Sequence, residues 1–161
     1  MPDSCCTPTE QPTESQPARS CPGCGQHGRP VSLLTVQALV ALSLRELGQP
    51  PYWFCPTPGC AVVYFAAGAV PITCNQLRER VYQKAPDPDV LVCYCFRYSR
   101  GAFQHTDSVG RAAILADVVG GTRQGQCACE VRNPQGSCCL GNLRRLLHEP
   151  ADSFAECEED G

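Results

Sequence analysis

The sequence lacks the features of a membrane-spanning or secreted protein. It has no apolar stretch close to the ~20 residues that a membrane-spanning helix needs, because its longest helical pattern is interrupted by Arg45 and Glu46. Its N-terminus has no basic segment followed by an apolar one, as a signal peptide would have. We therefore expect a cytoplasmic protein with no membrane insertion.

Basic stripes and catalytic groupings are also missing. The net charge is −3 and no stripe of basic residues is present, so nucleic acid is not an expected partner. His27, His105 and His148 have no nucleophile near them in the sequence and are expected at the surface. No glycine-rich loop precedes a predicted helix in the way that a phosphate-binding loop does. The sequence therefore does not predict an enzyme.

Cysteine, in contrast, is abundant, with fourteen among 161 residues. Eleven lie between Cys21 and Cys139, and ten of these fall into five short clusters. The clusters are Cys21/Cys24, Cys55/Cys60, Cys93/Cys95, Cys127/Cys129 and Cys138/Cys139. In a reducing compartment, clustered cysteines bind metals more often than they form disulfides. The sequence thus offers two sets of thiolates, each large enough for a four-coordinate site.

We expect an α+β fold made of two small units between two tails. Residues 1–19 are rich in Pro, Thr, Ser and Glu and are predicted to be a disordered tail. A zinc-ribbon-like unit is expected over 20–86, a mostly helical unit over 90–149, and an acidic tail over 150–161. Units below about 70–80 residues usually need a staple such as a structural metal.

The first unit is predicted to hold two strands and two helices. Thr35 is a candidate N-cap for a helix over 36–47, whose apolar spacing suits a buried face. Strands are expected over 52–54 and 61–65, followed by a short helix over 75–80.

In the second unit, the predicted elements are a strand over 90–95, helices capped by Ser99 and Asp107, and a Leu-rich helix over 140–147. The helix after Asp107 is expected to cover 109–119 and to end at Gly120 and Gly121. The cysteine-bearing segment before the last helix is expected to be a loop.

The cysteines of the first unit have the spacing of a structural zinc site. Cys21 and Cys24 flank a Pro–Gly turn, and Cys55 and Cys60 flank a Pro/Gly turn between two apolar strands. Four thiolates at ~2.3 Å around a tetrahedral ion describe a closed Zn²⁺ site. Two alternatives remain open, namely reduced core cysteines and a different ion or ligand set that includes His27.

A second site is expected to begin at Cys93 and Cys95, whose single intervening residue directs both sulfurs to one side of a strand. Iron–sulfur clusters are held by four thiolates with varied spacings. The residues alone leave the other pair open among four candidates, Cys127, Cys129, Cys138 and Cys139.

The remaining cysteines have no clear partners in the sequence. Cys74 follows an apolar run and is expected to be a buried small hydrophobic residue. Cys5 and Cys6 form a vicinal pair that could capture a soft metal or be an accidental dithiol, and Cys157 stands alone.

Two families share these motifs. The Val92–Cys95 segment, followed by helices and a Cys-bearing loop that enters a Leu-rich helix, resembles the bacterioferritin-associated ferredoxin type of [2Fe–2S] domain. A wider set resembles the N-terminal region of archaeal CopZ-type copper chaperones and their bacterial homologues, over roughly residues 20 to 148. That set comprises Cys21-Pro-Gly-Cys24, Phe54-Cys55, Cys60-Ala-Val-Val-Tyr-Phe65, Cys93-Tyr-Cys95 and Asn133-Pro-Gln-Gly-x-Cys-Cys139.

The resemblance implies one zinc ion and one [2Fe–2S] cluster in a compact unit. The zinc ligands it implies are Cys21, Cys24, Cys55 and Cys60. The cluster ligands it implies are Cys93, Cys95, Cys129 and Cys139. Cys139 is preferred to Cys138 because its spacing to Leu146 matches the ferredoxin pattern, and Cys129 is preferred to Cys127 because it directly precedes Glu-Val-x-Asn-Pro.

The sequence also departs from both families. The ferredoxin type has a Cys-x2-Cys pair before its last helix, whereas nine residues separate Cys129 from Cys139 here. The copper module of the chaperones carries a Met-x-Cys-x-x-Cys loop, and the only methionine in this sequence is Met1.

The function that these features favour is a metallochaperone or redox protein in copper or other soft-metal homeostasis. Its cluster would act as a one-electron donor, for example from Cu²⁺ to Cu⁺, and Cys5, Cys6, Cys127 and Cys138 would remain to bind Cu⁺. Expected partners are metal ions and a copper-transporting ATPase, a copper chaperone or a redox protein. The alternatives are a small electron-transfer ferredoxin serving a separate oxidoreductase, and a metal-stapled interaction module.

Overall fold

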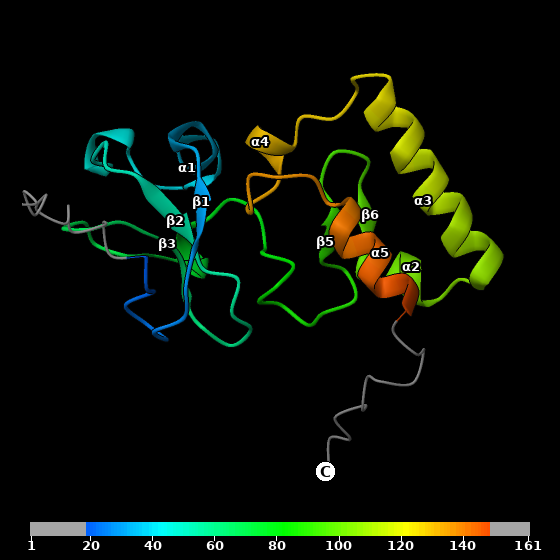
Figure 1. Ribbon diagram of the computed structural model, residues 1–161, viewed down its shortest axis with the longest axis horizontal. Helices are drawn as coiled ribbons and strands as arrows, with labels where there is room; N and C mark the ends of the chain where they lie inside the picture. The colour runs from blue at the N-terminus through cyan, green and yellow to red at the C-terminus, as the bar shows by residue number, and fades with distance from the viewer. Residues whose placement is uncertain (1–18, 149–161) are drawn as a thin grey trace, which may run out of the picture.

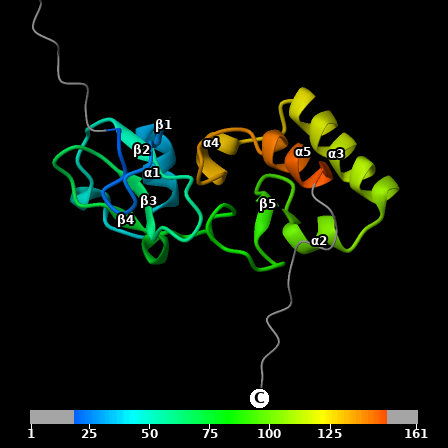
Figure 2. The same ribbon diagram turned by 60° about the horizontal axis from the view of Figure 1, so that its bottom comes forward.

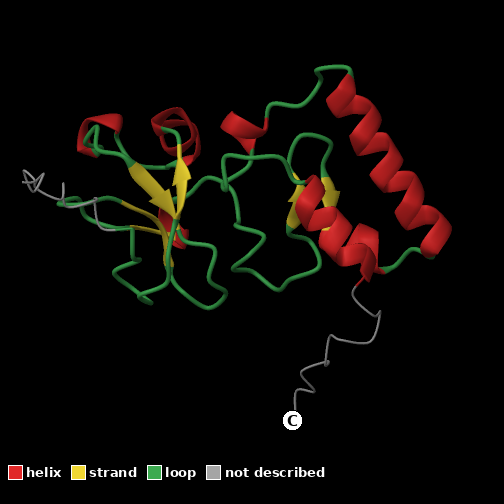
Figure 3. Cartoon of the chain, in the orientation of Figure 1, coloured by secondary structure: helices red, strands yellow, loops and turns green. Residues whose placement is uncertain are grey.

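The structure, a computed structural model, describes residues 19–148 and confirms the predicted α+β architecture. Figure 1 shows a small sheet at one end and the longer helices at the other, with α4 between them, and Figure 3 shows the same division by type of element. Among the described residues, no helix has the length and apolar character needed to cross a membrane.

The first unit is a four-stranded antiparallel sheet in the order β1–β2–β3–β4, flanked by short helices. Its elements are β1 (Arg29–Val31), α1 (Leu33–Leu39), η1 (Leu44–Glu46), β2 (Tyr52–Phe54), β3 (Val62–Phe65), β4 (Ile72–Thr73) and η2 (Cys74–Gln76). The strands predicted over 52–54 and 61–65 correspond to β2 and β3, whereas β1 and β4 were not predicted. Phe54, Val63 and Tyr64 are fully buried in its core together with Val36 of α1.

The second unit is a two-stranded hairpin covered by helices. Its elements are β5 (Leu91–Cys93), β6 (Tyr98–Ser99), α2 (Arg100–Gln104), α3 (Ser108–Arg123), α4 (Cys129–Arg132) and α5 (Leu140–His148). The predicted N-caps are confirmed, because Ser99 accepts a hydrogen bond from Ala102 N and Asp107 accepts one from Gly110 N. The predicted cysteine loop contains the short helix α4, which the sequence analysis did not anticipate.

The predicted helix over 36–47 is wrong in both its start and its length. The cap is Ser32, whose hydroxyl accepts from Thr35 N at 3.1 Å, and Thr35 is fully buried inside α1. α1 ends at Leu39 because Val40 is extended and forms a backbone bridge with Leu77. The same bridge holds Leu77 extended and ends η2, so the helix predicted over 75–80 is only the 3₁₀ turn Cys74–Gln76.

The predicted stop at Gly120 and Gly121 is also wrong, because α3 continues to Arg123. A Cβ at Gly121 would lie 2.4 Å from the ring of Phe96, whereas one at Gly120 would meet nothing within 4 Å. The absence of a side chain at Gly121 therefore lets α3 lie against the hairpin turn. Gly121 does not end the helix.

The two units are joined by more than the chain between them. α4, which belongs to the second unit in sequence, packs against α1 of the first, and Figures 1 and 2 both place it between the units. The buried Tyr64 hydroxyl of β3 donates to the carbonyl of Pro134 at 2.6 Å. Gly136 has a φ of +67°, and a Cβ there would lie 2.9 Å from Val31 and 3.0 Å from Thr35. The segment after α4 therefore packs closely against the first unit.

Candidate metal centres

The four cysteines predicted to form the first site converge at the end of the sheet where β2 is connected to β3. Their sulfurs all lie within 4.8 Å of one another, with Cys21 and Cys60 at 3.8 Å and Cys24 and Cys55 at 3.7 Å. Thiolates at ~2.3 Å from a tetrahedral ion are about 3.8 Å apart, so the donor set fits one Zn²⁺. A Cβ at Gly23 would lie 3.1 Å from the Cys60 sulfur, so glycine lets the first turn approach the second.

The electrostatics of this set also favour a bound cation. Burial raises the pKa of Cys21 to about 12 and raises that of Cys60. The Cys24 thiol donates to the Thr57 hydroxyl at 3.4 Å; when Cys24 ionises, the same hydroxyl can donate to the thiolate, which lowers the pKa of Cys24 to about 6. Neighbouring thiolates repel each other, so four sulfurs at these distances ionise together only around a positive charge. His27 is exposed and is not part of the convergent set.

Lys84 supports the second turn of this set and was missed by the sequence analysis. Its ammonium donates to the carbonyls of Thr57 and Cys60, both at 3.0 Å. An ammonium satisfies two carbonyls of a tight turn and lies close to thiolates that would carry negative charge around zinc. No spacing rule links Lys84 to Cys60, because the contact spans 24 residues of chain.

The four cysteines predicted to form the second set lie at or next to the ends of β5, α4 and α5. Cys93 ends β5, Cys95 lies in the turn that follows, Cys129 opens α4, and Cys139 directly precedes α5. The sulfurs of Cys95 and Cys129 are 3.7 Å apart. Within residues 19–148 the first set is the only group of three or more candidate ligands that lie within 4.8 Å of one another, so the second set is more widely spread. A site with two metal ions needs such a spread, since not all of its thiolates bind the same ion.

Contacts among these sulfurs divide them into proton donors and acceptors. A hydrogen bond from Cys139 lowers the pKa of Cys129 to about 5 and that of Cys93 to about 7. The same two bonds, together with burial, raise the pKa of Cys139. Burial raises the pKa of Cys95 to about 11, although the backbone N–H of Ala128 donates to its sulfur at 3.2 Å. Contacts between sulfur atoms thus link all four cysteines into one group.

The loop that carries Cys139 is held by a buried amide network. The Asn133 amide donates to Ser137 O at 2.8 Å, and Gln135 Nε2 donates to Cys138 O at 3.0 Å. Asn142 of α5 donates to Gln135 Oε1 at 3.0 Å. Asn133, Gln135 and Asn142 are all at most 8% exposed, so these bonds fix the loop in a water-poor setting.

The other cysteines are placed differently. Cys74 is exposed at the start of η2, so the prediction of a buried hydrophobic role is wrong; the preceding Ile72 fills the core position instead. Cys138 is exposed and contacts Cys129, and Cys127 is half-buried nearby. Cys5, Cys6 and Cys157 lie outside the described residues.

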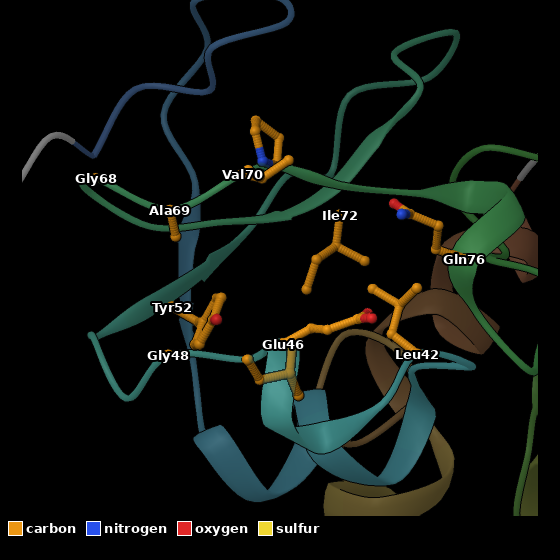
Figure 4. A pocket seen from close by; sticks show the side chains of 11 residues that line it. Leu42, Glu46, Gly48, Tyr52, Gly68, Ala69, Val70, Ile72 and Gln76 are labelled. Atoms are coloured by element: carbon orange, nitrogen blue, oxygen red, sulfur yellow. The ribbon is translucent and has the colours of Figure 1, made fainter.

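Within residues 19–148, neither the histidines nor the cleft beside η1 contributes a ligand to the sulfur sets. His27, His105 and His148 are exposed, as predicted. A cleft of about 450 Å³ lies between η1 and the β3–β4 connection, and Figure 4 shows the side chains that line it. Its only titratable lining groups are Glu46 and Tyr52, and no cysteine or histidine lines it. The cleft is therefore not a metal site.

Comparisons with known proteins agree with this geometry. Residues 18–78 match the family described as "Zinc binding domain". The X-ray structure of the Archaeoglobus fulgidus CopZ N-terminal domain matches with a TM-score of 0.61 and 30% identity, over 79% of this chain and 96% of that one. The chain belongs to the CopZ family. The resemblance to CopZ predicted from the cysteine motifs is thereby confirmed.

A curated relative extends the comparison to a longer protein. The copper chaperone CopZ of Archaeoglobus fulgidus is 32% identical over 127 residues, which cover 78% of this chain. The aligned part spans only 60% of that relative. The name of this relative describes it as a copper chaperone.

Proposed function

We propose that this chain is a zinc-stapled iron–sulfur metallochaperone that reduces and hands on a soft metal, with copper as the cargo. The observation that carries the proposal is the presence of two separate sulfur sets in a fold shared with the N-terminal domain of a copper chaperone. One set is compact enough for a single ion, and the other is more widely spread.

The first set is assigned a structural role. Cys21 is 2% exposed and Cys55 is fully buried, so an ion bound by Cys21, Cys24, Cys55 and Cys60 is closed to substrates. Zn²⁺ has no redox chemistry, and its binding energy in such sites contributes directly to folding. The small sheet, whose strands are only two to four residues long, gains its stability from this staple.

The second set is assigned to the cluster, with Cys93, Cys95, Cys129 and Cys139 as its ligands. A bound [2Fe–2S] cluster supplies one-electron redox chemistry. Cys93 ends β5, Cys95 lies in the turn after it, Cys129 begins α4 and Cys139 directly precedes α5, and the Ala128 N–H donates a hydrogen bond to Cys95. Hydrogen bonds to ligand sulfurs are among the features that set the reduction potential of such centres.

The cargo step transfers one electron. A reduced cluster held by Cys93, Cys95, Cys129 and Cys139 would supply this electron, so that Cu²⁺ becomes Cu⁺ while the cluster is oxidised by one electron. A separate low-potential electron carrier would then reduce the cluster again. Soft Cu⁺ prefers thiolates, and the exposed Cys138 and half-buried Cys127 lie beside the cluster ligands without being assigned to the cluster. Cu⁺ bound there would then pass to a copper-transporting ATPase or a second copper chaperone.

The test is a metal count on anaerobically purified protein. We expect about two irons, two acid-labile sulfides and one zinc per chain, with a reducible visible chromophore. Cys139→Ser should remove iron but retain zinc, whereas Cys138→Ser should retain both. Zinc without iron after reconstitution, or iron loss in Cys138→Ser alone, would contradict the assignment.

A simple electron-transfer ferredoxin is the second candidate. It is favoured by the same cluster set but needs no spare thiols. The double variant Cys127→Ser/Cys138→Ser separates the two functions, because it should keep the iron and still accept an electron from dithionite. If that variant still binds and transfers Cu⁺ as well as the unaltered chain, the spare thiols have no role and the ferredoxin function is preferred.

A further inference from the structure

Two consecutive residues at the junction of the units contact the loops of both sulfur sets. Lys84 donates to the carbonyls of Cys60 and Thr57 in the first set's second turn. Its neighbour Gln83 donates from Nε2 to Gln135 Oε1 at 2.5 Å. Two adjacent residues of the chain therefore contact the turn that carries Cys60 and, through Gln135, the loop that carries Cys139.

From Gln135 the contact continues to a predicted cluster ligand. The Gln135 amide donates to the carbonyls of Cys138 at 3.0 Å and Ser137 at 3.3 Å. The Cys138 carbonyl belongs to the peptide bond that joins Cys138 to Cys139. Because Gln135 is only 8% exposed, water cannot readily replace its partners.

We propose that Gln83 and Lys84 are positioning residues that couple the two metal sites, so that filling either site strengthens metal retention at the other. This inference rests on the proposed function, in which both sets bind metal. Neither residue is a ligand; each acts through carbonyl or amide groups that set the position of a ligand-bearing turn.

The physical basis is the ordering of shared side chains. Bound zinc would hold the turn between Cys55 and Cys60 in one conformation. The carbonyls of Thr57 and Cys60 in this turn would then hold the ammonium of Lys84 in place. Once Lys84 is fixed, the backbone at Gln83 is fixed as well, and the Gln83 amide meets Gln135 at a smaller entropic cost. A second ligand that binds to an already ordered element loses less conformational entropy, which produces positive coupling without any change of fold. Such coupling is reciprocal for equilibrium affinities.

The test compares zinc release in two states of the full-length protein. Zinc is transferred to the chromophoric chelator 4-(2-pyridylazo)resorcinol under anaerobic conditions, once with the cluster reconstituted and once with it absent. Iron is counted first, so absence of iron would overturn the proposed function and with it this coupling. With iron present, we expect zinc release to be about tenfold slower in the cluster-loaded protein. Equal rates in the two states would overturn the coupling alone.

Variants then locate the coupling. Gln83→Ala and Lys84→Met should each bring the ratio of the two rates close to one, whereas Lys84→Arg, which retains a cationic donor, should preserve it. Gln124→Ala and Arg45→Met are matched controls at exposed positions and should leave the ratio unchanged. A ratio that persists in both Gln83→Ala and Lys84→Met would show that the coupling does not pass through this pair. The cluster's visible spectrum and iron count in each variant identify any variant that has lost the site itself.

Discussion

At the scale of single residues, we expect the contact between the two units to depend on the Tyr64 hydroxyl. Tyr64→Phe keeps the ring in the core but leaves the buried carbonyl of Pro134 without its donor. We expect the free energy of unfolding to fall by about 1–3 kcal/mol, the usual cost of an unsatisfied buried polar group. Urea denaturation of the metal-loaded protein measures this loss.

Tyr98→Phe is the matched control for that change. Tyr98 also donates to an oxygen, that of Asp117 at 2.8 Å, but this bond is exposed to water. Its removal should cost no more than about 0.5 kcal/mol. Equal losses in the two variants would mean that the Tyr64 bond does not brace the junction.

Gly136 gives a second prediction at this scale. Gly136→Ala places a Cβ on a left-handed backbone and also against Val31 and Thr35, at 2.9 Å and 3.0 Å. Gly125→Ala introduces the same backbone strain, at a φ of +71°, but meets nothing within 4 Å. We expect Gly136→Ala to be the more destabilising by about 1–3 kcal/mol, the typical cost of overpacking. Similar midpoints in thermal melts of the two variants would contradict this.

The residues that could be predicted from sequence are those whose signal is local. Paired cysteines in Pro/Gly turns mark ligands because the short spacing itself directs two sulfurs to one point. Lys84 and Tyr64 carry no such signal, since their contacts span 24 and 70 residues of chain. The choice of Cys139 over Cys138 came from the resemblance and stays a prediction; in the structure Cys139 is 2% exposed and Cys138 is exposed.

At the scale of elements, the two adjacent glycines of α3 should respond in opposite ways to alanine. Gly120→Ala adds a better helix former in open space, so we expect a gain of about 0.8–1 kcal/mol. Gly121→Ala forces the Phe96 ring away from α3 and should destabilise the protein by about 1–3 kcal/mol. Thermal melts followed by circular dichroism measure both changes. Stabilisation by both variants would show that Phe96 moves freely.

The errors at element scale have a common physical cause. The apolar periodicity over 36–47 was real, since Val36, Leu39 and Val40 are buried. The backbone nevertheless leaves the helix at Val40 because its bridge to Leu77, far along the chain, competes with the next helical turn. Local propensity cannot reveal a long-range backbone bridge, whereas the capping at Ser99 and Asp107 depends only on neighbours three residues away and was predicted correctly.

At the scale of the whole molecule, the charged residues are unevenly distributed along the chain, which the net charge of −3 does not reveal. All thirteen Lys and Arg residues lie within 19–148, together with seven of the sixteen acidic residues, so this part of the chain carries +6. The other nine acidic residues lie in 1–18 and 149–161. The expectation that nucleic acid is not a partner was based on the net charge of −3 and the absence of a basic stripe in the sequence, and it stays a prediction. An anisotropy titration with labelled duplex DNA at low salt tests it.

The last prediction concerns the cooperativity of the two units. α4 packs on α1, and the Tyr64 bond and the close approach of Gly136 join the same segments, so neither unit can unfold without exposing part of the other. Trp53, the only tryptophan, packs among the cysteines of the first set, while the cluster would absorb visible light in the second. We expect tryptophan fluorescence and visible absorbance to change at the same urea concentration, as in a two-state transition. Tyr64→Phe should lower both midpoints together. Two well-separated midpoints in the unaltered protein would mean instead that the units fold independently, with their contacts contributing little to the stability of either.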